Sequence, residues 1–467
     1  MATQFPAFID ALEQRHLADL RFSEVTRALR ALSSTYVERR ETALAAHKAL
    51  DGAGKRAAFA LYYGPLHFLL IEHIAREIGI ELAPGVIVDL GCGTGVGGAA
   101  LASSGGRLSA LGIDSHPWAL DEARFTYAAF GVKADVRRGH AANTRLAGLR
   151  RIELGGAVGP EHLAIGPDGL LYAAVSGGLV LRMKPDGGER AVFAKTGGRV
   201  LGFDFDAAGR MIAADAIRGL LAIDREGAVR VLVDAVDGEP LRYADAVAVA
   251  PDGKVYFTDA SRRFSPRDWG GTFEASVLDL LENSATGRVL VYDPATGAVQ
   301  RVAGGLSFPN GIVLTQDGRG LLVAESGRYR IWRIAADARG LDLSGGAPPA
   351  AASVLLDGLP GYPDNLVRGL EGRIWTGFTK PRSALLDSLA PYPALRKVTL
   401  RLPRAMWPVP KPYGHVIAFT EDGRIVADLQ DPSGAYPETT AVTETLQRLY
   451  VQSLHADSIG WLPNGAR

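Results

Sequence analysis

The stretch FPNGIVLTQDGRGLLVAESGR (residues 308–328) shows how most of this chain is built. Apolar side chains alternate through Ile312 and Leu314, the pattern breaks at the Asp-Gly pair 317–318, and a second apolar run follows at 321–323. Alternation with a period of two is typical of half-buried strands, and glycine supplies the positive φ that a tight hairpin turn needs. The stretch therefore predicts two short strands joined in a hairpin.

The same pattern recurs along the second part of the chain. GPEHLAIGPDGLLYAAVSGG begins at Gly159, YADAVAVAPDGKVYFTDASRR at Tyr243 and YPDNLVRGLEGRIWTGFTKPR at Tyr362. Repeated units of several short strands indicate a mainly β protein, a β-propeller in which each sheet forms one blade. About six blades are predicted, with units that start near Glu161, Leu201, Asp245, Asn310, Asp364 and Thr443.

The spacing of these units grows toward the C-terminus, which predicts loops inserted between strands. The longest insertion, ALLDSLAPYPALRKVTLRLPRAMWPVPKPYGHV at 384–416, is rich in proline but also contains Trp407 and several leucines. A long loop with apolar side chains is expected to pack, so this segment is predicted to cover one mouth of the central channel.

Length and composition place the chain among globular proteins with two domains, predicted here at 1–146 and 147–467. Lys and Arg together number 51, as do Asp and Glu, so no general attraction to nucleic acid or anionic membranes is expected. The single cysteine, Cys92, excludes internal disulfides and suits a cytoplasmic protein. The first residues carry charges within their apolar pattern, so neither a signal peptide nor a membrane span is expected.

The front of the chain has helical and then α/β character. Apolar residues recur at helical spacing from Phe5 to about Leu50. VIVDLGCGTGVGGAALASSGG then predicts a buried strand, a Gly-rich turn and an Ala-rich helix, and a second strand at 108–113 ends at Asp114. Without Cβ atoms a ligand can approach such a turn closely, and an acidic residue after the second strand can accept from a ribose hydroxyl pair. A purely structural turn is the alternative.

The motifs DLGCGTGVGGAA and GIDSHPWALDEARFTYAAFG resemble class I S-adenosylmethionine-dependent methyltransferases, and among them a group associated with the small ribosomal subunit. The resemblance covers roughly residues 15–146 and implies a Rossmann-like domain. It implies that Gly91, Gly93 and Gly95 face the methionine part of the cofactor and that Asp114 binds the ribose.

The front departs from this family after its third predicted strand, KADVRRGHAANTRL. Such methyltransferases use about seven strands and build the acceptor side after the fourth. Nothing after Leu146 has the pattern of another strand and helix. An incomplete sheet argues against methyl transfer, leaves residual S-adenosylmethionine binding open, and makes RNA or the ribosome a partner only if the front is functional.

Three repeats of the second part carry an oxygen-bearing side chain directly after a proline: Glu161, Asn310 and Asp364. Residues that begin the inner strands of a propeller point toward one common opening. Two carboxylates and an amide oxygen, with no thiol, describe a hard-cation site, most simply one for Ca²⁺. Asn365 and Asp245 could add oxygen ligands. The alternative is that these motifs only form turns, as Asp and Asn often do.

The second part resembles the strictosidine synthase-like and SMP-30/gluconolactonase superfamily, and within it the branch that includes adipocyte plasma membrane-associated protein. The resemblance lies in GPEHLAIGPDGLLYAA, GRVLVYDPATG, LSFPNGI, LPGYPDNL and the tail LYVQSLHADSIGWL, and it covers nearly all of residues 152–463. It implies a six-bladed propeller and, as in hydrolytic members, a divalent cation at Glu161, Asn310 and Asp364. Relatives with lactonase activity often carry a further Asn where this chain has Ala244-Asp245.

Strictosidine synthases proper place a catalytic Glu on the last blade. By the resemblance this chain offers Thr443 or Glu444 there, within VTETL, which argues against alkaloid condensation.

The leading functional hypothesis is a metal-dependent hydrolase that acts on a small-molecule lactone or ester. Asp245, His162 and His415 are the candidates for the group that activates water. Two alternatives remain open: a methyltransferase that carries a propeller as a binding module, and a propeller scaffold without catalysis.

Overall fold

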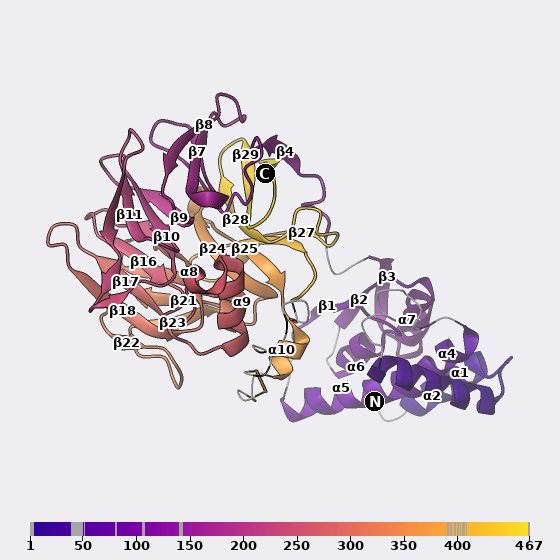
Figure 1. Cartoon of the computed structure of the whole chain (residues 1–467). Helices are drawn as coiled ribbons and strands as arrows, with labels where there is room; N and C mark the ends of the chain where they lie inside the picture. The colour runs from indigo at the N-terminus through magenta and orange to yellow at the C-terminus, as the bar shows by residue number, and fades with distance from the viewer. Residues whose placement is uncertain are drawn as a thin grey trace. The chain divides into compact units, whose positions relative to one another are not determined.

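A computed structural model describes residues 4–38, 50, 52–79, 82–104, 108–139, 143–389 and 409–465, with isolated positions between 392 and 407. The chain divides into two compact units, Met1–Ala142 and Asn143–Arg467, which are considered one at a time (Figure 1).

The second unit is a six-bladed β-propeller, as predicted (Figure 1). In chain order, its first three sheets are β5–β8 (His162–Ile165, Leu171–Val175, Leu179–Met183, Ala191–Lys195), β9–β12 (Val200–Phe205, Met211–Asp215, Gly219–Ile223, Val229–Val233) and β15–β18 (Ala244–Val249, Val255–Asp259, Gly287–Tyr292, Val299–Leu306). A short strand, β22 (Leu341–Asp342), adds to the outer edge of the third sheet, and β13 (Ala235–Val236) pairs with β14 (Glu239–Pro240).

The fourth to sixth blades complete the ring. They comprise β19, β20, β21 and β23 (Pro309–Leu314, Gly320–Glu325, Arg330–Ala335, Ala352–Leu356), then β24–β27 (Gly361–Arg368, Ile374–Pro381, Gly414–Phe419, Ile425–Asp431), then β28–β30 (Thr439–Glu444, Arg448–Ser453, Ser458–Pro463). The last unit thus starts four residues before the predicted Thr443.

The ring is closed by a strand from the beginning of the unit. β4 (Arg150–Glu153) pairs antiparallel with β30, with Ile152 opposite Ile459. Figure 1 shows this purple strand beside the yellow C-terminal strands. Closure pairs the first strand of the unit with the last sheet, so neither is left as a free edge.

The hairpin predicted at 308–328 is confirmed. β19 and β20 pair antiparallel around the turn that contains Gly318, whose φ is +69°. Interleaved apolar side chains from neighbouring blades then form the core, for example Val289, Leu321 and Trp332.

Five inner strands share an irregularity near their first residues. The antiparallel register shifts between Val200 and Gly202, between Ala244 and Val247, between Pro309 and Ile312, at Pro363 in β24, and between Thr439 and Val442. An extra residue in one strand changes the direction in which nearby side chains point, and such irregularities are common beside functional sites.

Two insertions lie at the same end of the ring. The first, between β16 and β17, forms α8 (Pro266–Trp269) and α9 (Thr272–Glu282), two helices that the sequence analysis missed. The second follows β25 and begins with α10 (Ala384–Ser388). The central part of this insertion lies mostly outside the described residues, but Arg396 donates from Nε to the carbonyl of Leu281 at 2.9 Å.

The first unit has the predicted helices followed by a three-stranded parallel sheet in the order β1-β2-β3. Its elements are α1 (Gln4–His16), α2 (Phe22–Glu38), α4 (Ala53–Ala58), a π-helical turn (Phe59–Tyr63), α5 (Gly64–Glu77), β1 (Gly85–Leu90), α6 (Val96–Ser104), β2 (Leu108–Asp114), α7 (Pro117–Ala129) and β3 (Lys133–Arg138). Phe8, Phe68 and Phe130 meet in its core. Among the described helices, none is long and apolar enough to cross a membrane.

Candidate functional site

The starts of the inner strands bring four polar side chains to one cavity. Glu161 directly precedes β5, and Asp245 is the second residue of β15. Asn310 is the second residue of β19, and Asp364 is the fourth of β24. All four line the same cavity and are 3–6% exposed. Their sequence separations are large, so only the closed ring brings them together.

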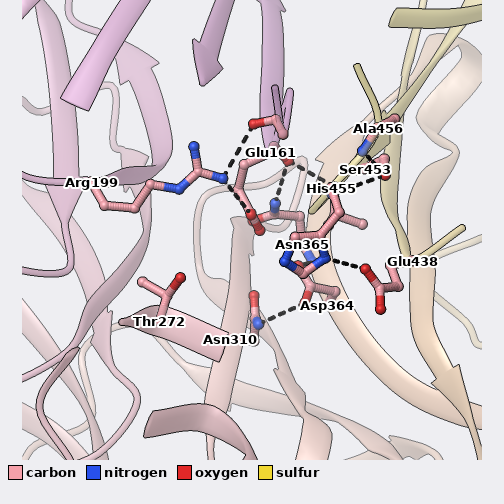
Figure 2. Close-up of polar contacts among 12 residues, drawn as sticks. Glu161, Arg199, Thr272, Asn310, Asp364, Asn365, Glu438, Ser453, His455 and Ala456 are labelled. Atoms are coloured by element: carbon pink, nitrogen blue, oxygen red, sulfur yellow. Dashed lines mark hydrogen bonds and ion pairs between the residues drawn. The ribbon is translucent and has the colours of Figure 1, made fainter. Parts of the chain in front are cut away.

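Direct hydrogen bonds connect this cluster (Figure 2). Asn310 Nδ2 donates to Asp364 Oδ2 at 3.1 Å, and the Asn365 backbone amide donates to Asp364 Oδ1 at 2.9 Å. On the other side, Arg199 Nη2 donates to Glu161 Oε2 at 3.1 Å. The cluster therefore contains one ion pair and one amide–carboxylate pair.

Asn365 supports the cluster without lining the cavity. Its Nδ2 donates to the backbone carbonyl of Glu161 at 3.1 Å, and Thr440 Oγ1 donates to the same oxygen at 2.7 Å. Blades five and six thus hold the backbone of the first blade. The Asn365 side chain thus helps to hold the Glu161 backbone, and its predicted role as a cation ligand stays a prediction.

Burial strongly disfavours the charged forms of these acids. It raises the pKa of Asp364 well above its usual range, and the nearby carboxyls of Glu161 and Asp245 raise it further. The pKa of Asp245 is raised in the same way, by burial and then by Glu161. Burial also raises the pKa of Glu161, against the opposing effect of Arg199. When ionised, the three acids carry more negative charge than the one guanidinium of Arg199 can balance.

The donor set fits a hard divalent cation. With Asn310 Nδ2 bound to Asp364, the other amide atom, Oδ1, is buried and receives no hydrogen bond from the described residues. An amide oxygen beside carboxylates is the ligand chemistry that Ca²⁺ prefers. The described residues contain no group of three or more His, Cys, Asp or Glu side chains arranged as a metal site, so the amide would be an essential member.

Arg199 was not found by the sequence analysis. It directly precedes β9, the place that Glu161 occupies before β5, and it is 8% exposed. Besides Glu161, its Nη2 donates to the Gly159 carbonyl at 3.2 Å. Its charge both stabilises the Glu161 carboxylate and competes with any cation for that carboxylate.

Two of the predicted proton-transfer residues lie away from the cavity. His162 packs edge-on against Phe203, with ring centroids 4.8 Å apart, and burial lowers its pKa to about 4. His415 packs against Phe378, and burial lowers its pKa as well. Neither is among the residues that line the cavity, whereas Asp245 is.

A different histidine lines the cavity. His455, in the turn after β29, has its Nδ1 against Glu438 Oε2 (Figure 2). The bond to Glu438 raises the pKa of His455, and burial opposes this. Lys380 Nζ lies 2.6 Å from the second oxygen, Glu438 Oε1. Burial acts to raise the pKa of Glu438, but the bonds from His455 and Lys380 bring it below its usual value.

Glu438 directly precedes β28, as Glu161 precedes β5. Had the sequence analysis placed the start of the last repeat at Thr439, the preceding Glu438 would have been a candidate site residue. Glu444 lies at the far end of β28, where its Oε2 accepts from Trp375 Nε1 at 2.9 Å and its Oε1 pairs with Arg373 at 3.0 Å. The acidic residue that the last blade contributes near the cavity is therefore Glu438, while Glu444 has a structural role.

The glycine-rich turn of the first unit is hydrogen-bonded to the end of β2. Asp114 Oδ2 accepts from the Gly93 amide at 2.9 Å, and Oδ1 accepts from the His116 amide at 2.8 Å. A Cβ at Gly95 would lie 2.9 Å from the Cα of Ala123, so this glycine is required for packing against α7. Gly91 has open space at the corresponding position, which permits close approach of a ligand.

Family models match three parts of the chain. The model described as SMP-30/Gluconolactonase/LRE-like region matches residues 166–385, and the model described as strictosidine synthase-like, N-terminal, matches residues 139–183. A methyltransferase domain model matches residues 87–150.

Curated relatives match between about half and two thirds of the chain. Protein STRICTOSIDINE SYNTHASE-LIKE 13 of Arabidopsis thaliana is 33% identical over 244 residues, which cover 51% of this chain and 57% of that protein. Adipocyte plasma membrane-associated protein of Danio rerio is 33% identical over 301 residues, 59% of this chain and 68% of the relative. Protein STRICTOSIDINE SYNTHASE-LIKE 6 of Arabidopsis thaliana is 30% identical, with 64% and 75% covered.

Among solved structures, a gluconolactonase from Xanthomonas campestris is similar with 20% identity and a TM-score of 0.46, covering 70% of this chain and 93% of that one. A protein described as the calcium-binding protein regucalcin, from Agrobacterium tumefaciens, has 17% identity and a TM-score of 0.43, covering 66% and 93%.

The second unit is thus a six-bladed propeller with an acidic cavity built from the starts of its inner strands. The chain belongs to the strictosidine synthase-like family, and a methyltransferase-like part precedes its propeller.

Proposed function

We propose that the propeller hydrolyses a small-molecule lactone or ester with the help of a divalent cation, most simply Ca²⁺. The observation that carries this proposal is the composition of the cavity, where three buried carboxyl groups line the same space as an amide oxygen that receives no hydrogen bond from the described residues. The match of residues 166–385 to the SMP-30/gluconolactonase model supports a reaction at a lactone or ester carbonyl.

Charge balance argues for a cation of charge two. Glu161, Asp245 and Asp364 carry three negative charges when ionised, and Arg199 supplies one positive charge, which leaves two negative charges. A divalent cation held by Glu161, Asn310 and Asp364 would balance them and return the pKa values of the acids toward their usual range. Without it, burial and the neighbouring carboxyl groups keep the pKa values of Asp245 and Asp364 raised.

A bound cation would polarise the substrate carbonyl and neutralise the negative charge that develops on its oxygen. The other tasks fall to the chain. Asn310 and Asp364 hold each other in place through their 3.1 Å hydrogen bond, and Arg199 fixes Glu161. Such mutual support keeps the polar groups in position before the substrate binds.

His455 is our candidate for the group that takes a proton from water. Its Nδ1 is engaged by Glu438, so a neutral ring presents an unprotonated Nε2, as a general base requires. Glu438 in turn is held by Lys380. Asp245 is the alternative base, and the negative charge of Glu161 beside it would make it a stronger proton acceptor.

The direct test combines metal analysis of the purified chain with a screen of lactones and aryl esters, run with Ca²⁺ and with excess chelator. We expect about one divalent cation per chain and hydrolysis that the chelator abolishes. Hydrolysis that persists at full rate in chelator would contradict the role of the cation. If the chain binds the cation but hydrolyses nothing, a non-catalytic scaffold becomes the better description.

The methyltransferase model that matches residues 87–150 favours a second candidate function in the first unit. Against methyl transfer stands a described sheet of three strands, in which Asp114 is already bonded to the Gly93 amide. We expect calorimetry to show weak or no binding of S-adenosylmethionine. Tight binding, with transfer of labelled methyl groups to ribosomal RNA or protein, would overturn this expectation.

A further inference from the structure

A recess with mainly apolar walls adjoins the acidic cavity. Phe273, Leu280, Tyr362 and Leu454 line both spaces, so the two share a wall. Beyond that wall, the recess is lined by the apolar residues Val277, Leu281, Leu386, Val409 and Pro410. Both insertions of the propeller therefore contribute to it.

Helix α9 supplies most of one side of the recess. Phe273, Val277 and Leu280, at spacings of four and three, lie on one face of the helix. They are only half-buried, whereas Ala275 and Leu278 on the other face are fully buried. The helix thus packs with one apolar face and leaves the other available to the recess.

The helix is held at both ends. Tyr243, which lines the acidic cavity, donates from its hydroxyl to the Thr272 carbonyl at 2.9 Å at the first residue of α9. At the C-terminal end, the Arg396 guanidinium donates to the Leu281 carbonyl, and a cation is favourable there because the last carbonyls lack helical partners. The wall is therefore formed before any ligand binds.

The proposed proton-transfer pair lies where the two spaces meet. Glu438 lines the recess, and its partner His455 lines the acidic cavity. A carbonyl that lies over the acidic cavity, within reach of His455, would extend the rest of its molecule along α9.

We propose that this chain acts on amphiphilic substrates, lactones or esters whose carbonyl carries an alkyl or aryl arm that fills the recess. This inference rests on the hydrolase function proposed above. A sugar lactone has hydroxyl groups on most carbons, and those facing Val277, Leu280 and Leu386 would find no hydrogen-bond partner. A methylene arm removes apolar surface from water at the same positions.

The test is a chain-length series of 4-nitrophenyl esters, from acetate to octanoate, with saturating Ca²⁺. We expect kcat/KM to rise about threefold to fourfold for each added methylene until the recess is filled. Glucono-1,5-lactone, which carries hydroxyl groups in place of an alkyl arm, should be a poor substrate. A flat or falling series would overturn the inference, and no hydrolysis of any compound would instead overturn the proposed hydrolase function.

Val277 offers a selective variant because it lines the recess and does not line the acidic cavity. Val277→Asn should lower octanoate hydrolysis about tenfold more than acetate hydrolysis, because only the longer arm reaches the apolar wall. Val277→Phe should move the preferred chain to a shorter length. Leu446→Asn, at an apolar position that is 82% exposed in the turn after β28, is the matched control and should change neither rate.

Calorimetry with octanoate and acetate gives a reading that needs no turnover. We expect octanoate to bind more tightly than acetate to the wild type, and this preference to be lost in Val277→Asn. If octanoate and acetate bind the wild type equally well, the recess does not select the substrate. The same conclusion follows if Val277→Asn changes acetate and octanoate hydrolysis no differently from the control Leu446→Asn.

Discussion

The propeller cavity and the Asp114 turn of the first unit both place carboxylates at strand ends, but they differ in what those carboxylates bind. Asp114 uses both oxygens to accept backbone amides of the first unit, one from Gly93 and one from His116. In the cavity, three buried acids share one guanidinium, and Asn310 Oδ1 has no donor among the described residues. A satisfied carboxylate needs no ligand, whereas an unbalanced buried cluster needs a cation or protons.

The two units also differ in how their sheets end. β4 pairs with β30 and closes the propeller. The described sheet of the first unit ends at β1, a parallel strand with Val86, Val88 and Leu90 more than half exposed. Parallel sheets are normally covered on both faces. The closed ring can therefore support an organised site, whereas the described sheet of the first unit has three strands and an exposed edge at β1.

The largest expected effect comes from removing a charged cavity ligand. Asp364→Ala should lower hydrolysis about a thousandfold and weaken Ca²⁺ binding, because a cation contributes several kcal/mol to stabilising the transition state. Asp364→Asn keeps the shape of the side chain and should weaken binding less. Rates and Ca²⁺ titrations measure both effects.

Asp114→Ala is the matched control for that comparison. It removes a carboxylate that is bonded within the first unit, so hydrolysis and Ca²⁺ affinity should stay within about twofold of the wild type. A loss as large as that of Asp364→Ala would contradict the assignment of the reaction to the propeller cavity.

The next effect concerns the proton-transfer pair. His455→Gln should lower kcat/KM about a hundredfold, the lower end of the range for a general base. Because a base must be unprotonated and the pKa of His455 is raised, kcat/KM should increase with pH through a value above the ordinary 6.5 of histidine. Measured profiles of kcat/KM against pH test whether the rise occurs above that value.

Glu438→Gln distinguishes catalysis from structure. Loss of the carboxylate removes the main cause of the raised pKa of His455, so the rising limb of the pH profile should move to lower pH. A merely structural role would reduce activity at all pH values alike and leave the limb in place. If the rising limb of the pH profile stays in place in both His455→Gln and Glu438→Gln, Asp245 is favoured as the base.

A smaller effect is expected on stability. At a hundredfold excess over its Kd, Ca²⁺ should stabilise the propeller by about 2.7 kcal/mol, because the site exists only in the closed ring and the ion therefore binds the folded state alone. Differential scanning calorimetry should show a higher melting temperature for the propeller with Ca²⁺ than with chelator. S-adenosylmethionine should produce no comparable shift in the first unit.

The pH dependence of the chelated protein follows from the raised pKa values of Asp245 and Asp364. Burial raises the folded-state pKa of each acid above its unfolded value, so their contribution to stability is complete at low pH and is lost as pH rises toward the folded pKa values. The melting temperature of the chelated propeller should fall as pH rises, and Ca²⁺ should oppose this fall. An increase of melting temperature with pH in chelator would contradict the charge imbalance.

The smallest effects compare two glycines of the first unit. Gly95→Ala should destabilise that unit by about 2 kcal/mol, because its φ of +76° is strained for alanine and the Cβ would meet Ala123 at 2.9 Å. Gly91→Ala has the strain of a φ of +69° without the clash, so about 1 kcal/mol is expected. Chemical denaturation measures both, and neither should change ester hydrolysis.

The sequence was sufficient for the repeated elements of the fold. Alternation with a period of two, broken at turns such as Asp317-Gly318, predicts each hairpin from local residues, and repetition predicts the ring. The same repetition placed Glu161, Asn310 and Asp364 in equivalent positions, and the structure brings these three to one cavity. Local pattern and register are therefore enough to predict site residues that occupy equivalent positions in repeated units.

Tertiary structure decided which other side chains join them. His162 follows Glu161 directly, yet the alternation of a strand turns it against Phe203, whereas His455 reaches the cavity from a turn at the far end of the sequence. Arg199 meets Glu161 across 38 residues, and Thr440 meets it across 279. Such partners depend on ring closure and on the irregular strand starts that redirect side chains. Both are long-range properties that a local pattern does not contain.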